Sequence, residues 1–201
     1  MRFVSVIFHP LIMATYFMCV LLIYEPSFFS PVDASQVPRL ILAAFVTTFV
    51  IPVLSILIMK FTSRISTLSM SDREERIIPF ISIFLFYAAT TYLFIARLGI
   101  HPPLSTMMIA MTLLIGLLLI ITHWQKISIH AAASWGSAGL LSGIFIIYPA
   151  EGIMTPLLVS LIIAGIVSSS RLYLQRHTEK EVWTGSMIGF LVGLFSVIWF
   201  G

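Results

Sequence analysis

Long apolar runs alternate with short polar segments along this chain. Seven such runs are present, at about 3–23, 39–59, 79–96, 103–122, 130–148, 153–169 and 184–200. A helix needs about 20 mostly apolar residues to cross a bilayer. Continuous runs of this length favour helices, because the strands of a membrane barrel would alternate apolar and polar residues. The pattern predicts an all-α integral membrane protein, folded as a compact bundle of six to seven transmembrane helices.

Composition narrows the class of protein further. Hydrophobic residues make up 59% of the 201 residues and charged residues 9%, and the mean hydropathy is +1.07. The runs leave no room for a soluble domain, so we expect one polytopic membrane domain over 1–201. The first run shows no small-residue cleavage site before Glu25, which favours a retained span over a signal peptide. We expect the lipid bilayer as a partner, no nucleic acid and no cofactor, while the oligomeric state stays open.

Basic residues are distributed unevenly among the loops. Seven crossings place the N-terminus and the loops 60–78, 123–129 and 170–183 on one face, together with nine of the 11 basic residues. The other face carries only Arg39 and Arg97. Because loops rich in Lys and Arg face the cytoplasm, we expect a multi-pass protein of the bacterial cytoplasmic (inner) membrane with these polar loops inside. The same crossings bring three polar clusters to one face.

The most distinctive polar cluster lies between the sixth and seventh runs. Ser170 and Arg171 end the sixth run, and His177 and Glu181 begin the seventh. Four residues apart on a helix, His177 and Glu181 share a face, so the carboxylate can hold the imidazole in one tautomer. Such a histidine can act as a nucleophile or general base, and the guanidinium of Arg171 suits phosphate oxygens. The alternative is an interfacial turn whose charges meet lipid headgroups.

Two weaker clusters precede it in the chain. Lys126, Ser128 and His130 open the fifth run, where the free N–H groups of a helix start form an anion site. Ser128 would serve equally well as a helix cap, and His130 as an interfacial histidine. Arg73 and Arg76 lie three residues apart before the third run. They could clamp a phosphate, or pair with neighbouring carboxylates as a solvated helix start.

Together these motifs resemble those of the type 2 phosphatidic acid phosphatase superfamily. The segment 170–181 reads SRx5HxxxE, similar to the third motif of that family, SRx5HxxxD. The segment 127–130 reads ISIH, similar to the family's PSGH, and a basic segment ending at Pro79 precedes both in the family's order. The resemblance covers a phosphatase-like core of about 60–190.

The resemblance implies a metal-independent phosphatase that hydrolyses a phosphomonoester or pyrophosphate on a membrane lipid. His177 would attack phosphorus and form a phosphohistidine, Glu181 would orient it, and His130 would protonate the departing oxygen. The remaining motif residues would hold the phosphoryl oxygens as charge develops: Arg171, Ser128, Arg73, Arg76, Lys126 and Ser170. The implied substrate is a lipid such as phosphatidate, phosphatidylglycerol phosphate or a polyprenyl phosphate.

The chain departs from the family pattern at several positions. The first motif, Kx6RP, is absent, Ile129 replaces a glycine, and Glu181 replaces an aspartate. These changes keep a second hypothesis open, a degenerate phosphatase-like protein that binds or moves an anionic lipid. A third class, a transporter that relays protons through histidines, is disfavoured because His130 and His177 lie at the ends of runs.

Small residues recur in the two runs that carry these histidines. In the seventh run they repeat every four residues, at Gly185, Gly189 and Gly193. In the fifth run they occur at Ala132, Gly136, Gly139 and Gly143. Such spacing lets helices approach closely, so we expect these two helices to pack tightly.

Three further histidines lie near the ends of apolar runs. His9 and His101 each precede a proline near a membrane boundary, and His123 lies beside Trp124. None has a partner at metal-ligand spacing, so we expect no metal site.

Overall fold

Helices account for all regular secondary structure in the computed structural model, which describes residues 2–66, 74–148 and 151–201. The α-helices are α1 (Arg2–Ile7), α2 (Met13–Tyr24), α3 (Val37–Phe45), α4 (Ile51–Phe61), α5 (Ile77–Tyr92), α6 (Leu104–Thr122), α7 (Ile129–Ile147), α8 (Met154–Tyr173) and α9 (Glu179–Phe200). Short 3-10 segments are η1 (Pro10–Ile12), η2 (Pro26–Phe29), η4 (Glu74–Arg76) and η6 (Glu151–Ile153), and π-helical segments are η3 (Val46–Val50) and η5 (Leu93–Arg97).

Within these ranges, six helices have the length and apolar composition needed to cross a membrane. Two of them are composite: Val37–Phe61 joins α3, η3 and α4, and Ile77–Arg97 joins α5 and η5. The other four are α6, α7, α8 and α9. The chain is therefore a multi-pass membrane protein with an all-α fold, which confirms the fold class predicted from the apolar runs.

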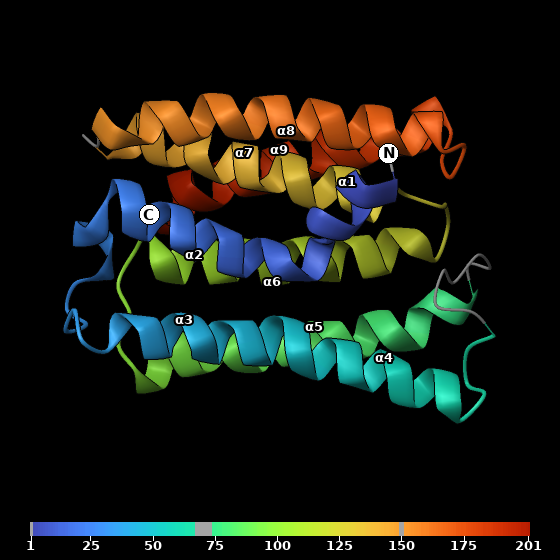
Figure 1. Ribbon diagram of the computed structural model, residues 1–201, viewed down its shortest axis with the longest axis horizontal. Coiled ribbons are helices and arrows are strands. Elements are labelled where there is room, and N and C mark those ends of the chain that lie inside the picture. The colour runs from blue at the N-terminus through green and yellow to red at the C-terminus, as the bar shows by residue number, and fades with distance from the viewer. Residues whose placement is uncertain (1, 67–73, 149–150) are drawn as a thin grey trace.

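The helices lie along one common axis in three layers (Figure 1). Helices α7, α8 and α9 form one layer, α2 and α6 the middle layer, and α3, α4 and α5 the third. Successive membrane-spanning helices alternate in direction, so the segments 74–76, 123–128 and 174–178 meet at one end, near the N-terminus. We call this the motif end, because the described parts of all three polar clusters lie there.

The first apolar run differs from the single span expected over 3–23. It forms α1, breaks at Phe8 and His9, and continues as a shorter apolar helix over Pro10–Tyr24. Proline donates no hydrogen bond and disfavours helical geometry in the preceding residue, and His9 accordingly has an extended ψ of 134°. At 1.5 Å per residue the Pro10–Tyr24 helix is roughly 22 Å long, less than the ~30 Å hydrocarbon core.

Helices α7 and α9 pack backbone against backbone through small residues. A Cβ atom added to Gly189 would lie 2.0 Å from the carbonyl oxygen of Ala132, and one on Gly139 would lie 2.1 Å from that of Phe190. At Gly193 the corresponding distance to the carbonyl oxygen of Gly136 is 2.2 Å. No side chain fits at these positions, so the close packing expected from the glycine spacing is confirmed.

This contact predicts a specific sensitivity to one methyl group. Gly189→Ala should lower the free energy of unfolding by about 1–3 kcal/mol, because the two backbones must separate to admit the Cβ atom. Gly165→Ala on α8 is the matched control, since a Cβ there meets nothing within 4 Å. Thermal unfolding of both variants in detergent measures the difference. Equal stability of the two variants would contradict the packing described for α7 and α9.

Candidate functional site

A cavity of about 430 Å³ lies between the layers and reaches the motif end. Its polar lining consists mainly of histidine, arginine and lysine side chains: His9, Arg76, Lys126, His130, Arg171, Arg176 and His177. Deeper in the bundle the lining is almost entirely apolar, with residues such as Val53, Ile83, Met111, Leu114 and Leu140. No carboxylate lines it in the described part of the chain. The cavity therefore joins a cationic mouth to an apolar interior.

His177 and Glu181 form a short polar pair at this mouth. The Nδ1–H group of His177 donates to Oε2 of Glu181 at 2.6 Å, and the side chains are 7% and 19% exposed. Thr178 caps α9, because its Oγ1 accepts from the N–H of Glu181 at 3.3 Å. A carboxylate oxygen only accepts, so Nδ1 carries the ring proton. Nε2 of neutral His177 then keeps a lone pair that can attack an electrophile.

The turn between α8 and α9 determines where His177 lies. The N–H of Arg176 donates to the carbonyl of Arg171 at 3.3 Å, and that of Gln175 to Leu172 at 2.9 Å. These bonds form a Schellman motif, whose left-handed position is usually glycine. Here it is Gln175, with φ of 50°, which costs about 1–2 kcal/mol. The tight reversal returns the chain over the end of α8, beside Arg171.

The surroundings of His177 favour its neutral form. Burial lowers the pKa of His177 below its ordinary value of 6.5, and the positive charges of Arg171 and Lys126 lower it further. The hydrogen bond and charge of Glu181 act in the opposite direction. Burial is the largest of these effects, so the imidazole is neutral at pH 7 and keeps its nucleophilic lone pair.

Three guanidinium groups gather beside this histidine. Arg76, which precedes α5, is only 7% exposed. Burial lowers the pKa of Arg76 while the charge of Glu181 raises it, and a guanidinium stays protonated in proteins. Arg171 feels the like charges of both Arg76 and Arg176. Such mutual repulsion at a half-buried site is relieved by an anion, which arginine forks bind well.

The other residues predicted from sequence have different positions. Lys126 and His130 line the cavity together with His177. Ser128 is fully buried and caps α7, because its Oγ accepts from the N–H of Ala131 at 3.4 Å. Ser170 is also fully buried, within the last turn of α8. Neither serine is among the residues that line the cavity, and their role as phosphate ligands stays a prediction.

One predicted ligand cannot be placed, and three residues that line the cavity were not predicted from the sequence. Arg73 lies outside the described residues. His9, Arg176 and Tyr87 line the cavity but were not predicted as site residues. The crossing count already placed the N-terminus on the motif face, so the His9-Pro10 break could have marked His9 as a residue near the site. The sequence suggested only that Arg176 meets lipid headgroups. The direction of its side chain depends on the turn at Gln175, which the sequence pattern does not reveal.

Comparison with known proteins assigns neither a family nor a function to this chain. Searches against protein-family models, curated proteins and solved structures found no significant match to this chain. Among the described residues, no group of three or more His, Cys, Asp or Glu side chains could hold a metal ion. The chemistry of the site therefore has to be argued from its own residues.

The pKa of His177 gives a direct test of this geometry. In the folded protein the His177 ring should titrate below pH 6.5, and Glu181→Gln should move the midpoint lower still, since the carboxylate favours the charged imidazole. Glu179→Gln, in the same exposed turn, should leave it unchanged. Ring resonances of histidine-labelled protein report these midpoints. A midpoint above 6.5, or no response to Glu181→Gln, would contradict the arrangement.

Proposed function

We propose that this protein is a membrane lipid phosphate phosphatase that works through a phosphohistidine intermediate. The observation that carries the proposal is the cavity, in which an oriented neutral histidine and several cations meet an apolar interior. A phosphate group matches the cationic mouth, and a hydrocarbon chain matches the apolar depth. The resemblance of the motifs in 127–130 and 170–181 to the type 2 phosphatidic acid phosphatases supports the same reaction.

The proposed reaction begins with in-line attack on phosphorus. Nε2 of His177 forms the N–P bond while the P–O bond to the lipid alcohol or phosphate breaks. His130 gives a proton to the departing oxygen, and Glu181 stabilises the charge that develops on the imidazole. Water then attacks the phosphohistidine, His130 takes its proton, and inorganic phosphate leaves. Arg76, Arg171 and nearby cations would stabilise the transferred phosphoryl group, the main source of catalysis in such reactions.

Two departures from the family pattern are compatible with turnover. The side chain of Glu181 is one methylene longer than aspartate, yet it reaches Nδ1 of His177 at 2.6 Å. Ile129 stands where the family has glycine, but it is the first residue of α7 and does not have a positive φ. The absence of the Kx6RP motif still favours the second candidate, a protein that binds or moves an anionic lipid, so the tests include a binding measurement.

Substitution of the nucleophile tests the proposed reaction. Purified wild-type protein should release phosphate from at least one member of a panel of phosphatidate, phosphatidylglycerol phosphate, polyprenyl phosphate and polyprenyl diphosphate. His177→Ala should reduce that release by about 10³-fold or more, because no covalent intermediate can form. His123→Ala is the matched control, since His123 is an exposed histidine at the same end of the bundle.

The outcomes of this assay separate the two candidates. Release by His177→Ala at the wild-type rate would overturn the mechanism, and loss of release in a strong chelator would point to a metal-dependent reaction instead. No release by folded wild-type protein that still co-purifies with a lipid phosphate would favour the binding protein. Thermal unfolding of each variant establishes that it is folded.

We also propose that the motif end faces the cytoplasm of a bacterial inner membrane. The described basic residues at this end include Lys60, Arg64, Arg76, Lys126, Arg171, Arg176 and Lys180, whereas Arg39 and Arg97 lie at the opposite end. This asymmetry follows the preference of basic loops for the cytoplasm.

Labelling from outside the cell tests the orientation. With the single Cys19 replaced by alanine, a cysteine introduced as Lys180→Cys should resist an impermeant thiol reagent in intact cells. The matched variant Ser35→Cys lies in the exposed connection at the opposite end and should be labelled. Labelling of Lys180→Cys and protection of Ser35→Cys would reverse the orientation.

A further inference from the structure

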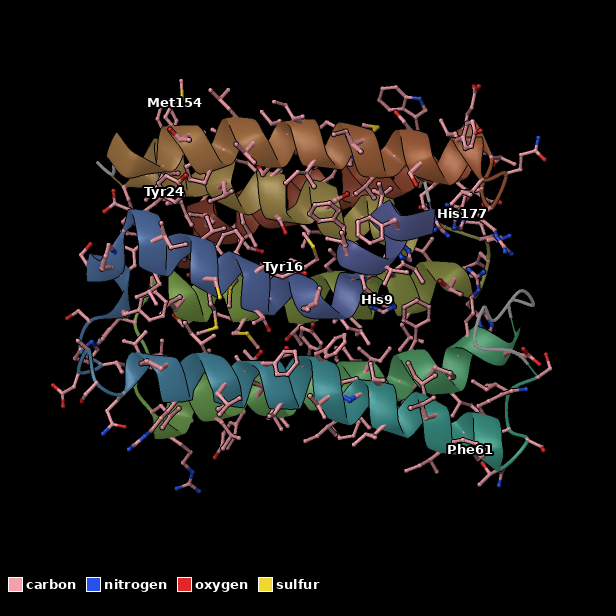
Figure 2. The ribbon with its side chains drawn as sticks, viewed as in Figure 1. His9, Tyr16, Tyr24, Phe61, Met154 and His177 are labelled. Atoms are coloured by element: carbon pink, nitrogen blue, oxygen red, sulfur yellow. The ribbon has the colours of Figure 1, made fainter. Side chains whose placement is uncertain are left out.

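His9 lies in the candidate site although its segment lies outside the phosphatase-like core. Its ring contacts that of His130 edge to face, with ring centroids 5.6 Å apart and an interplanar angle of 81°. Both rings line the cavity that also contains His177. Figure 2 places His9 in the same half of the molecule as His177, with Tyr24 and Met154 at the opposite end. The N-terminal segment thus contributes a third histidine to the mouth of the cavity.

The backbone fixes the orientation and tautomer of His9. Nδ1 of His9 accepts a hydrogen bond from the N–H of Leu11 at 3.3 Å, so the side chain caps η1. An Nδ1 atom that accepts cannot carry a proton, so the ring is neutral and its proton is on Nε2. The cap exists because Pro10 interrupts the helix and leaves the first N–H groups of η1 to be satisfied by a side chain.

A second contact holds the same segment from the opposite side. The hydroxyl of Tyr87, from α5, donates to the carbonyl oxygen of Leu11 at 3.3 Å. Tyr87 is 2% exposed and also lines the cavity. The break at His9 is therefore held by its own cap and by α5, and it presents the His9 ring to α7 as a fixed surface.

We propose that His9 is a positioning residue for His130: its neutral, capped ring packs against the His130 ring and holds it toward the bound phosphate ester. The inference rests on the proposed function, in which His130 passes a proton to and from the substrate. An imidazole turns about two side-chain torsions, so each contact that restricts the ring improves its position, and small errors in the position of an acid cost large factors in rate. A neutral neighbour also adds no repulsion when His130 becomes charged.

The described charged and titratable groups that line the same cavity, or pair with a residue that does, come from five other parts of the bundle. They are Arg76 and Tyr87 at and within α5, Lys126 before α7, Arg171 on α8, Arg176 and His177 in the following turn, and Glu181 on α9. Most are cationic, so they favour access of water and anions to this part of the cavity. The His9 ring covers one face of His130 against such access.

The test compares His9→Asn with His101→Asn in the full-length protein. Asparagine keeps an acceptor for the N–H of Leu11 but removes the ring, and His101 is a second histidine before a proline, exposed at the opposite end. In His9→Asn, kcat should fall about 10- to 100-fold with KM nearly unchanged. The ring resonances of His130 should broaden or split, because the ring loses the edge-to-face contact that restricts its rotation. His101→Asn should change neither, and His9→Phe, which keeps a ring, should retain more activity than His9→Asn.

The ring resonances decide the proposal independently of catalysis. They are measured on histidine-labelled protein and need no turnover. If the wild-type protein hydrolyses no lipid phosphate, the proposed function is refuted, but the ring resonances still test the contact between His9 and His130. His130 ring resonances that stay as sharp and single in folded His9→Asn as in the wild type would overturn the positioning role. So would a wild-type His9 whose Nδ1 is protonated, a measurement that needs no variant. Equal kcat for His9→Asn and His101→Asn in an active protein would refute it kinetically.

Discussion

The direct backbone contact between α7 and α9 is the constraint on which the site depends. Because Gly139, Gly189 and Gly193 carry no side chain at the contact, the two helices cannot slide or rotate past each other without losing it. The N–H of Ser128 donates to the carbonyl of Glu181 at 3.2 Å, which ties the start of one helix to the first turn of the other. His130 in the first turn of α7 and His177 just before the cap of α9 are thereby held at the same end of the bundle, where both line the cavity.

Several cations at the motif end line the same cavity as these two histidines. Arg76 comes from the third layer and Arg171 from α8, and both approach His177 although like charges repel there. Ionised groups near hydrocarbon are costly and persist where they serve a ligand or a partner. The proposed phosphate ester would offset the repulsion, while its chain would fill the apolar remainder of the cavity. Charge and shape thus favour the same class of ligand, an amphipathic anion.

Sequence alone predicted the regular parts of this molecule well. Apolar run length located the six long helices, glycine spacing predicted the α7–α9 contact, and i,i+4 spacing predicted the bond between His177 and Glu181. Irregular backbone was harder, because the direction of a side chain there depends on local dihedrals that hydropathy does not encode. Hence the first run was predicted as one span although its helix breaks at His9. The hydroxyl of Ser128 was left open between a helix cap and a phosphate ligand, and the structure shows the cap.

The charge of His177 distinguishes a phosphatase from a protein that only binds phosphate. A binding site gains affinity from a protonated imidazole, because that adds one more positive charge opposite the anion. A nucleophile has to be neutral, since only the free Nε2 lone pair can attack phosphorus. Burial together with Arg171 and Lys126 lowers the pKa of His177 despite the bond to Glu181. The same cations that would bind the substrate therefore help to keep the imidazole of His177 neutral. This link between phosphate binding and a neutral nucleophile favours turnover over simple binding.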